Sequence, residues 1–180
     1  MGKRSSFERV ERDFYPTPWR AVEPLVSHLP EEFAFAEPCG GDGALVNHIE
    51  TLIDGAWCSW VSDIEPQKKG IHTKHFRDLS EHEFLEADYI ITNPPWDRKL
   101  LHPMIEYFTA FRPTWLLFDA DWMHTKQSAS FMHRLHKIVS IGRVKWIENS
   151  KSTGKDNCCW YLFDAKYDGE TKFYGRRKEL

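Results

Sequence analysis

Short apolar runs alternate with helix-like segments along most of this chain, and this alternation limits the possible folds more than any other feature. Four runs have the apolar, β-branched and aromatic character of buried strands, and a weaker fifth run has part of it. In chain order the five runs span 33–36, 57–62, 72–76 (the weak one), 89–92 and 114–118. Strands that alternate with helical segments predict a parallel sheet covered by crossover helices.

Five segments between or beside these runs are expected to be helical. They span 17–28, 44–53, a short stretch that opens at Ser80, 100–111 and 128–136. Thr17 followed by Pro18 is a typical helix start, with an N-cap residue and then a proline in the first turn. Ser80 and Glu83 have the spacing of a capping box, and Pro103 is expected in the first turn of its helix.

The alternation stops near the C-terminus. Runs at 138–147 and 158–163 are joined by the polar loop 148–157 with no helix between them, which predicts an antiparallel hairpin. The whole pattern predicts the α/β class: a doubly wound, mostly parallel seven-stranded sheet with a C-terminal antiparallel hairpin. Such sheets bind ligands beyond the carboxyl ends of their strands, so the turns at that edge are candidate sites.

The length of 180 residues predicts one domain, with a basic arm at 1–12, a core at 13–164 and a basic tail at 165–180. The apolar runs are far shorter than the roughly 20 residues that span a bilayer. The first residues contain no apolar leader. Four cysteines without a C-x-x-C pair indicate free thiols and no metal site. We therefore expect a cytoplasmic protein that makes no contact with membranes.

Charge is distributed unevenly along the chain, although the formal net charge is only -3. Between residues 21 and 67 there are nine acidic residues and no lysine or arginine. Between residues 126 and 155 there are seven basic residues and one acidic residue. A chain divided in this way can bind a polyanion with one face, and an ordinary solvated surface explains the same pattern equally well.

A glycine-rich turn follows the first strand, with the sequence Glu37-Pro38-Cys39-Gly40-Gly41-Asp42-Gly43. Glycines let the backbone turn sharply and approach a ligand closely, and the following helix points its N-terminus at the same place. The turn is neither G-x-G-x-x-G nor a P-loop, because no Gly-Lys-Ser/Thr follows. It predicts a ligand-binding turn, with a plain strand-to-helix connection as the alternative.

Three further residues after strands are placed to bind a nucleotide-like ligand. Asp63, at the end of the second strand, can accept hydrogen bonds from both hydroxyls of a ribose, and Ile64 can pack on an adenine face. Asp78 follows the weak third strand and can accept from an adenine amino group. An N-cap role for Asp63 is the competing interpretation.

The fourth motif, Asn93-Pro94-Pro95-Trp96, directly follows the strand 89–92. The two prolines fix the backbone and remove two N–H groups, so the carbonyls before them can face a ligand. Asn93 adds a side-chain carbonyl, and Trp96 adds a flat ring. Together these groups predict a socket for a planar group that bears an amine, with a rigid structural turn as the alternative.

These motifs resemble those of the class I, S-adenosylmethionine-dependent amino methyltransferases of nucleic acids. The run Asp-Phe-Tyr-Pro-Thr-Pro at 13–18 resembles the segment that precedes the fold in many phage and bacterial DNA adenine methyltransferases. The four motifs occur in the family's order across residues 13–164, and 156–163 is similar to the family's final hairpin strand. Two departures are the cysteine at position 39 and the absence of a separate target-recognition domain.

The resemblance implies a set of functional residues. S-adenosylmethionine is the expected cofactor, with Glu37 near its ammonium and Asp63 on its ribose. The expected cofactor-binding residues are Tyr15, Pro16, Thr17, Pro18, Glu37, Cys39, Gly40, Gly41, Gly43, Asp63, Ile64 and Asp78. Asn93 and the carbonyl of Pro94 would accept from the target amine, which is bounded by Pro95 and stacked on Trp96. Neither a metal nor a histidine base is required.

The resemblance also implies a substrate, the exocyclic amine of adenine in DNA, inside a bacterial or phage-infected cell. RNA adenine, a protein glutamine amide, and a non-catalytic role as a cofactor-binding partner subunit remain alternatives. A base inside a duplex must be flipped out to reach such a socket. Phosphate contacts are expected from the hairpin lysines Lys145, Lys151 and Lys155. A homodimer or a partner subunit would supply sequence specificity.

Overall fold

The computed structural model of the protein describes residues 14–147 and 154–176. Within these residues the chain forms eight strands, of which the first seven follow the apolar runs of the sequence. The strands are β1 (Glu32–Glu37), β2 (Gly55–Asp63), β3 (His72–Thr73), β4 (Tyr89–Thr92), β5 (Thr114–Asp119), β6 (Leu135–Arg143), β7 (Asn157–Phe163) and β8 (Lys172–Tyr174). The weak third run supplies only two strand residues, because the chain enters a 3₁₀ turn at Phe76–Asp78 soon after them.

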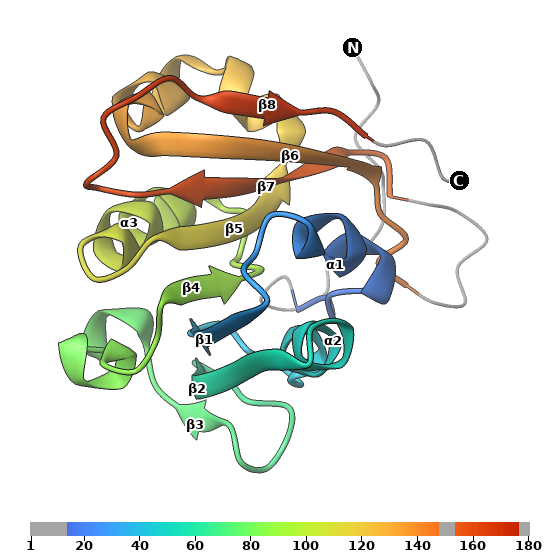
Figure 1. Ribbon diagram of the computed structural model, residues 1–180, viewed down its shortest axis with the longest axis vertical. Coiled ribbons are helices and arrows are strands. Elements are labelled where there is room, and N and C mark those ends of the chain that lie inside the picture. The colour runs from blue at the N-terminus through green and yellow to red at the C-terminus, as the bar shows by residue number, and fades with distance from the viewer. Residues whose placement is uncertain (1–13, 148–153, 177–180) are drawn as a thin grey trace.

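All eight strands form one sheet in the order β3-β2-β1-β4-β5-β7-β6-β8 (Figure 1). β7 runs antiparallel to its neighbours β5 and β6, and the other pairs in the sheet are parallel. The fold class that the sequence predicts, a doubly wound sheet with a C-terminal antiparallel hairpin, is therefore confirmed, with eight strands in place of seven.

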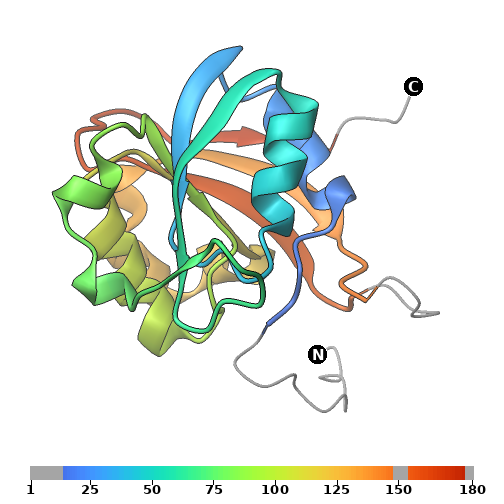
Figure 2. The same ribbon diagram turned by 90° about the horizontal axis from the view of Figure 1, so that it is seen from below.

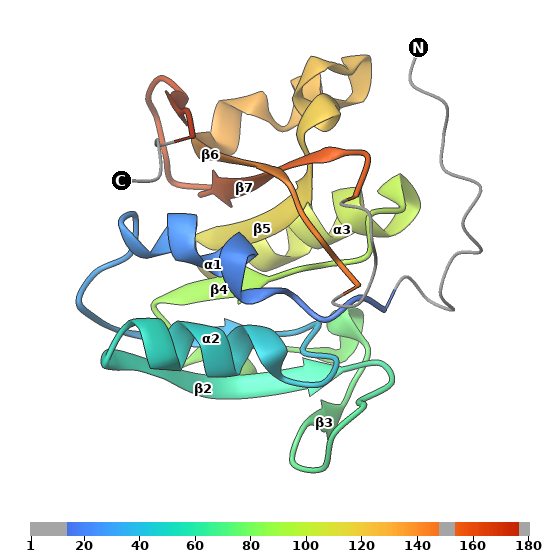
Figure 3. The same ribbon diagram turned by 90° about the vertical axis from the view of Figure 1, so that its right-hand side faces the viewer.

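Helices cover both faces of this sheet. α1 (Trp19–Val26) and α2 (Ala44–Leu52) lie side by side on one face, and α3 (Arg98–Thr109) covers the other together with short 3₁₀ turns (Figures 2 and 3). Successive strand residues point to opposite faces, so Ile90 packs in the core beneath α3 while Ile91 packs beneath α1 and α2. The central strands are apolar on both sides, as a parallel sheet buried between two helical layers requires.

The start of the first helix differs from the sequence prediction. Thr17 does not cap α1: the N-cap residue is Pro18, in an extended conformation and without a side-chain cap. Thr17 is instead buried, and its hydroxyl accepts a hydrogen bond from Asn93, 76 residues further along the chain. A tertiary contact therefore takes the side chain that the local pattern assigned to capping.

Two later helix predictions also need correction. α3 begins at Arg98 because the Asp97 side chain accepts from the backbone N–H of Lys99, and Pro103 consequently lies in the second turn rather than the first. The segment 128–136 is not an α-helix: residues 128–134 end a series of 3₁₀ turns, and residues 135–136 begin β6. Here the Ser128 hydroxyl donates to the carbonyls of Met123 and Thr125, and such local bonds compete with an α-helical ladder.

The tail contributes to the sheet, which the sequence analysis missed. β8 pairs in parallel with β6, and the Thr171 hydroxyl donates to the Leu135 carbonyl across the same join. Three strand residues among charged neighbours give too short a pattern to detect from the sequence. The predicted capping box at Ser80 and Glu83 is present. Among the residues that the structure describes, no helix is long and apolar enough to cross a bilayer.

Candidate active site

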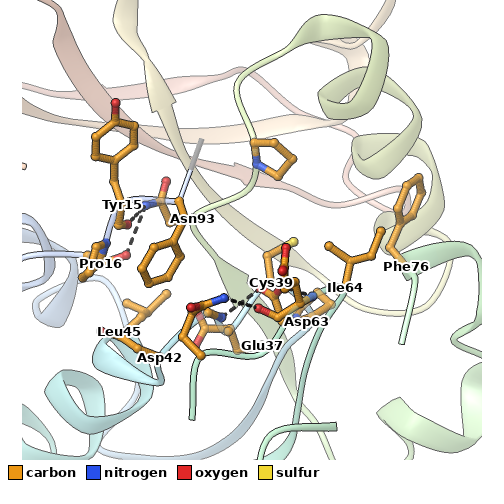
Figure 4. Close-up of a pocket in the computed structure, with 18 of the residues that line it drawn as sticks. Tyr15, Pro16, Glu37, Cys39, Asp42, Leu45, Asp63, Ile64, Phe76 and Asn93 are labelled. Atoms are coloured by element: carbon orange, nitrogen blue, oxygen red, sulfur yellow. Dashed lines mark hydrogen bonds between the residues drawn. The ribbon is translucent and has the colours of Figure 1, made fainter. Parts of the chain in front are cut away.

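A pocket of about 370 Å³ opens at the carboxyl ends of β1, β2 and β4 (Figure 4). The strand order changes direction between β1 and β4, and ligands bind at such switch points in doubly wound sheets. The pocket wall is drawn from segments far apart in the sequence. They are 14–17, 37–42 with Leu45 of α2, 63–67, 74–76, the turn after β4, and Leu100 and Met104 of α3.

The glycine-rich turn after β1 forms the floor of the pocket. The Gly40 N–H donates to the Ser62 carbonyl at 2.8 Å, and a Cβ at Gly40 would come within 2.5 Å of the Val61 side chain. Gly41 has a φ of +50°, and a Cβ there would come within 2.6 Å of the Phe14 ring. Both positions therefore exclude side chains, and at these two positions the turn brings backbone to the pocket.

Asp63 joins the turn after β1 to the turn after β2. One carboxylate oxygen accepts from the Gly41 N–H at 2.9 Å, and the other accepts from the Glu65 N–H at 2.8 Å. A carboxylate oxygen can accept more than one hydrogen bond, so both oxygens can also accept from a ligand. Ile64, with 55% of its surface exposed, follows as an open apolar wall of the pocket.

Glu37 is a buried acid in the pocket wall. It is 2% exposed, and its Oε2 atom has no hydrogen-bond partner among the described residues. Burial raises the pKa of this carboxyl well above its ordinary value, and the negative charges of Asp63 and Asp42 raise the pKa further. An orphaned acid of this kind favours a ligand that brings a positive charge or a hydrogen-bond donor.

The remaining charges of the pocket are mostly acidic. Lys74 lies in the wall, but its ammonium pairs with Glu83 and holds the pKa of that carboxyl at about 2. Cys39 also lines the pocket, and burial followed by the Asp63 charge raises the pKa of its thiol, so the thiol stays protonated and unreactive. Within the described ranges, no cluster of three or more His, Cys, Asp and Glu side chains is arranged to hold a metal.

Asn93 follows β4 and is fixed on both sides. Its Nδ2 atom donates to the Thr17 hydroxyl at 3.2 Å and to the Tyr15 carbonyl at 3.5 Å. Its Oδ1 atom accepts from the Trp96 indole N–H at 3.4 Å, and that indole also donates to the Leu117 carbonyl at 3.1 Å. The amide is thus oriented with its nitrogen toward the N-terminal segment and its oxygen toward Trp96.

Trp96 does not line the main pocket, although Asn93 and Pro95 do. It lines a second, smaller hollow of about 20 Å³ beside the same turn. Its ring also packs edge-on against Trp146, with 5.6 Å between the ring centroids, and Trp146 lies 6.4 Å from the Tyr15 ring. The turn after β4 therefore separates two hollows.

The structure brings most of the predicted residues together, but not all of them. Those that line the main pocket are Tyr15, Pro16, Thr17, Glu37, Cys39, Gly40, Gly41, Asp63, Ile64, Asn93 and Pro95. Pro18, Gly43, Pro94 and Trp96 lie in the same turns but outside the lining. Gly43, with a φ of +80°, is the N-cap of α2.

Asp78, which is predicted to accept from an adenine amino group, lies apart from the pocket lining. It lies in the exposed 3₁₀ turn after β3 and does not line the pocket, whereas His75 and Phe76 do. The sequence predicts a strand at 72–76, but the strand ends at Thr73. The chain then turns at His75, and this turn carries Asp78 away from the pocket. The apolar residue Phe76 was the sequence signal that could have indicated which part of this segment reaches the pocket. Phe14, Leu100 and Met104 also line the pocket, and no local pattern marks them.

The predicted nucleic-acid residues are only partly described. Lys145 and Lys155 are exposed on either side of the β6–β7 connection, and Lys151 lies outside the described residues, as do Asp13 and the basic arm at 1–12. The Gly154 N–H donates to the Val144 carbonyl at 2.8 Å, and this contact closes the base of the connection. Since Trp146 contacts Trp96, this connection lies on the same edge of the sheet as the pocket.

The chain matches no protein-family model and no curated protein, but its fold is similar to solved structures of methyltransferases. One is named as a class I S-adenosylmethionine-dependent methyltransferase from Listeria monocytogenes (TM-score 0.53, 11% identity, 87% of this chain and 62% of that chain). Another is a modification subunit assigned to a type I restriction enzyme of Vibrio vulnificus (TM-score 0.54, 10% identity, 92% and 48%).

A third is a dimethyladenosine transferase from Plasmodium falciparum (TM-score 0.51, 14% identity, 83% and 62%). The chain spans between 48% and 62% of the length of these three proteins. At identities this low, the structural similarity establishes the fold alone, which is the Rossmann-like methyltransferase fold.

Proposed function

We propose that the protein transfers a methyl group from S-adenosylmethionine to the exocyclic amine of adenine in DNA. One observation carries this proposal: Asn93 stands at the boundary between the main pocket and the Trp96 hollow, with its amide nitrogen occupied by Thr17 and Tyr15. Its Oδ1 atom accepts from the Trp96 indole N–H at 3.4 Å and keeps acceptor capacity for a second donor, such as a planar amine on the Trp96 side.

The residues of the main pocket fit S-adenosylmethionine. The ligand carries an ammonium and a sulfonium, and the pocket offers acidic groups, including the buried and unpartnered Glu37 oxygen. Gly40 and Gly41 leave the backbone of the turn exposed to a ligand, because a Cβ at either position would collide with Val61 or Phe14. Asp63 retains acceptor capacity for ribose hydroxyls, and Ile64 with Phe76 supplies apolar walls suited to an adenine ring.

When bound, S-adenosylmethionine would supply a methyl group on an electron-poor sulfur. The chain's own contribution is to make an aromatic amine nucleophilic. The lone pair of such an amine is delocalised into the ring. Acceptors at Asn93 Oδ1 and the Pro94 carbonyl favour a pyramidal nitrogen, in which the lone pair is free. As the nitrogen–carbon bond forms and the carbon–sulfur bond breaks, these acceptors hold the more positive amine until one proton leaves to solvent.

A nucleic-acid base is the substrate that the surroundings favour. Aromatic residues surround the turn after β4, and bases stack on such rings with about 1–3 kcal/mol each. Exposed lysines flank the adjacent β6–β7 connection and are suited to phosphate. The resemblance of the segment at 13–18 to phage and bacterial enzymes favours DNA adenine. Sequence specificity would then come from a partner subunit or a second copy of the chain.

Methyl transfer from labelled S-adenosylmethionine to DNA, RNA and protein in parallel tests the proposal, with Asn93→Ala as the matched inactive variant. We expect label in DNA with the wild-type protein and none with the variant. Label in RNA or in a protein glutamine amide would mean that the proposed substrate is wrong and that the proposed methyl transfer to an amine is right. Cofactor binding without transfer to any of the three would indicate a non-catalytic partner subunit.

A further inference from the structure

The hollow beside Trp96 contains a polar pair that the proposed reaction has not yet used. It is lined by Trp96, Arg98, Leu101, Phe118, Asp119 and Trp122. Leu101, Phe118 and Trp122 are almost fully buried, so Arg98 and Asp119 are the charged groups of an otherwise apolar recess. The recess borders Trp96 of the 93–96 turn, whereas the main pocket borders Asn93 and Pro95 of the same turn.

The two charged side chains face this recess without pairing with each other. One Asp119 oxygen accepts from the Asp121 N–H at 2.9 Å, and Arg98 donates from one nitrogen to the Gln127 side chain. No ion pair joins Arg98 to Asp119 in the described part of the chain. Burial raises the pKa of Asp119 above its ordinary value, and the Arg98 charge opposes this rise. The second carboxylate oxygen and the remaining guanidinium N–H groups are therefore available to a ligand.

Their chemistry selects a particular ligand edge. A guanidinium only donates and a carboxylate only accepts, so a ligand held by both must offer an acceptor beside a donor. The amidine edge of adenine has this pattern, with ring nitrogen N1 next to the N6 amine. A volume of about 20 Å³ has room for a water-sized group, so the recess receives the edge of a base rather than the whole ring.

We propose that Arg98 and Asp119 contact the target base, with Arg98 donating to its N1 atom and Asp119 accepting from its amine. The inference rests on the proposed function, because the base would enter from the Trp96 side of the turn. Asn93 would then accept one proton of the amine, and Asp119 would accept the other in place of the Pro94 carbonyl. The pair acts on the substrate alone, since neither residue lines the main pocket.

The test compares Asp119→Asn and Arg98→Gln with Asp121→Asn, which changes an exposed carboxylate in the same 3₁₀ turn. Asp119→Asn keeps an oxygen that can accept from the Asp121 N–H and replaces the other by a donor. Turnover and KM are measured on a DNA oligonucleotide, and cofactor affinity is measured by calorimetry. We expect kcat/KM to fall about tenfold to a hundredfold in both variants, with cofactor affinity and the Asp121→Asn control unchanged.

A second measurement separates contact with the base from a structural effect. The oligonucleotide carries 1-deazaadenine at the target position, which removes the N1 acceptor. Wild-type protein should lose about as much kcat/KM on this substrate as Arg98→Gln loses on adenine, and the two losses should not add. Additive losses would overturn the Arg98 contact, and kcat/KM of Asp119→Asn equal to that of the Asp121→Asn control would overturn the Asp119 contact.

Failure of this inference is distinguishable from failure of the proposed function. Wild-type protein that transfers methyl to adenine, with both variants equal to the control, overturns only the roles of Arg98 and Asp119. Wild-type protein that neither binds S-adenosylmethionine nor transfers methyl to DNA overturns both proposals together.

Discussion

The two sides of the main pocket are held together in different ways. The side formed by the turns after β1 and β2 is fixed by backbone N–H groups: Gly40 donates to Ser62, Gly41 to Asp63, and Gln67 to Gly41. All of these bonds join residues between 40 and 67. The side formed by the turn after β4 is fixed by side chains that reach across the fold, such as Asn93 to Thr17.

This difference indicates that the two sides of the pocket have different functions. A backbone-built surface has few conformations and suits a ligand that is bound in the same way in every turnover. A surface made of side chains from distant segments can be tuned for a changing partner, and here it contains Asn93, Trp96 and Trp146. We therefore expect changes on the first side to affect cofactor binding, and changes on the second side to affect the reaction with the target.

The largest expected effect belongs to the second side. Asn93→Ala should reduce turnover by about a thousandfold or more, because the variant loses an acceptor that stabilises the transition state. Cofactor affinity should stay nearly unchanged, as calorimetry would measure. An equal loss of cofactor affinity would break the comparison, since Asn93 would then serve mainly to hold the N-terminal segment through Thr17 and Tyr15.

On the first side, Gly41→Ala should reduce cofactor affinity about tenfold or more and destabilise the fold by roughly 1–2 kcal/mol. The cause is a φ of +50° together with a Cβ that would come within 2.6 Å of Phe14. Gly70→Ala is the matched control, because Gly70 has a φ of +93° but no atom within 4 Å of the added Cβ. Similar loss of cofactor affinity in both variants would mean that backbone strain, not the Phe14 contact, is responsible.

The pH dependence of folding stability tests the role of Glu37. Burial and the neighbouring acids raise its folded-state pKa above the ordinary value of 4.5. The folded protein therefore holds the proton more tightly than the unfolded chain, and this contribution to stability is lost as pH rises from about 4.5 through the raised pKa. Urea unfolding should show this decline in the wild-type protein.

The matched variant is Glu37→Gln, which cannot ionise and should lack that part of the decline. For the cofactor the sign is opposite: affinity of the wild-type protein should rise with pH over the same range, because the ionised carboxylate attracts an ammonium. A wild-type affinity that is flat with pH, like that of Glu37→Gln, would place the ammonium away from Glu37.

The smallest effect is expected at the hairpin. Lys145→Ala combined with Lys155→Ala should lower the slope of log affinity for DNA against log salt by about two, with cofactor affinity unchanged. Lys166→Ala with Lys172→Ala is the control, since these lysines lie at the opposite end of the C-terminal strands. A slope lowered only in the control pair would move the DNA surface to that end of the sheet.

The difference between local and long-range contacts also explains which pocket residues could be predicted from the sequence. The glycine-rich turn, Asp63 and Asn93 were found because each occupies a fixed place after an apolar run, and local spacing encodes that place. Phe14, Leu100 and Met104 were missed because they reach the pocket only through tertiary packing. Thr17 also shows that local patterns do not reveal tertiary contacts. Its local pattern predicts a helix cap, but its hydrogen-bond partner is Asn93.

Errors in secondary structure have related causes. Serine and threonine hydroxyls in 125–130 bond to nearby carbonyls and replace an expected helix by 3₁₀ turns, which binary apolar patterning does not detect. Asp78 lies outside the pocket lining because β3 ends at Thr73, and alternation alone does not distinguish a two-residue edge strand from a longer one. β8 depends on pairing with β6, so its three residues contain little information by themselves.

The central claim is that the pocket at the ends of β1, β2 and β4 binds S-adenosylmethionine, and calorimetric titration of wild-type protein and Asp63→Ala tests it most directly. The account predicts one bound ligand per chain for the wild-type protein. It also predicts an affinity loss in Asp63→Ala that corresponds to about 1–3 kcal/mol, because the acceptor for the ribose hydroxyls and the tie between the two turns are both removed. An affinity in Asp63→Ala equal to that of the wild-type protein would contradict the account.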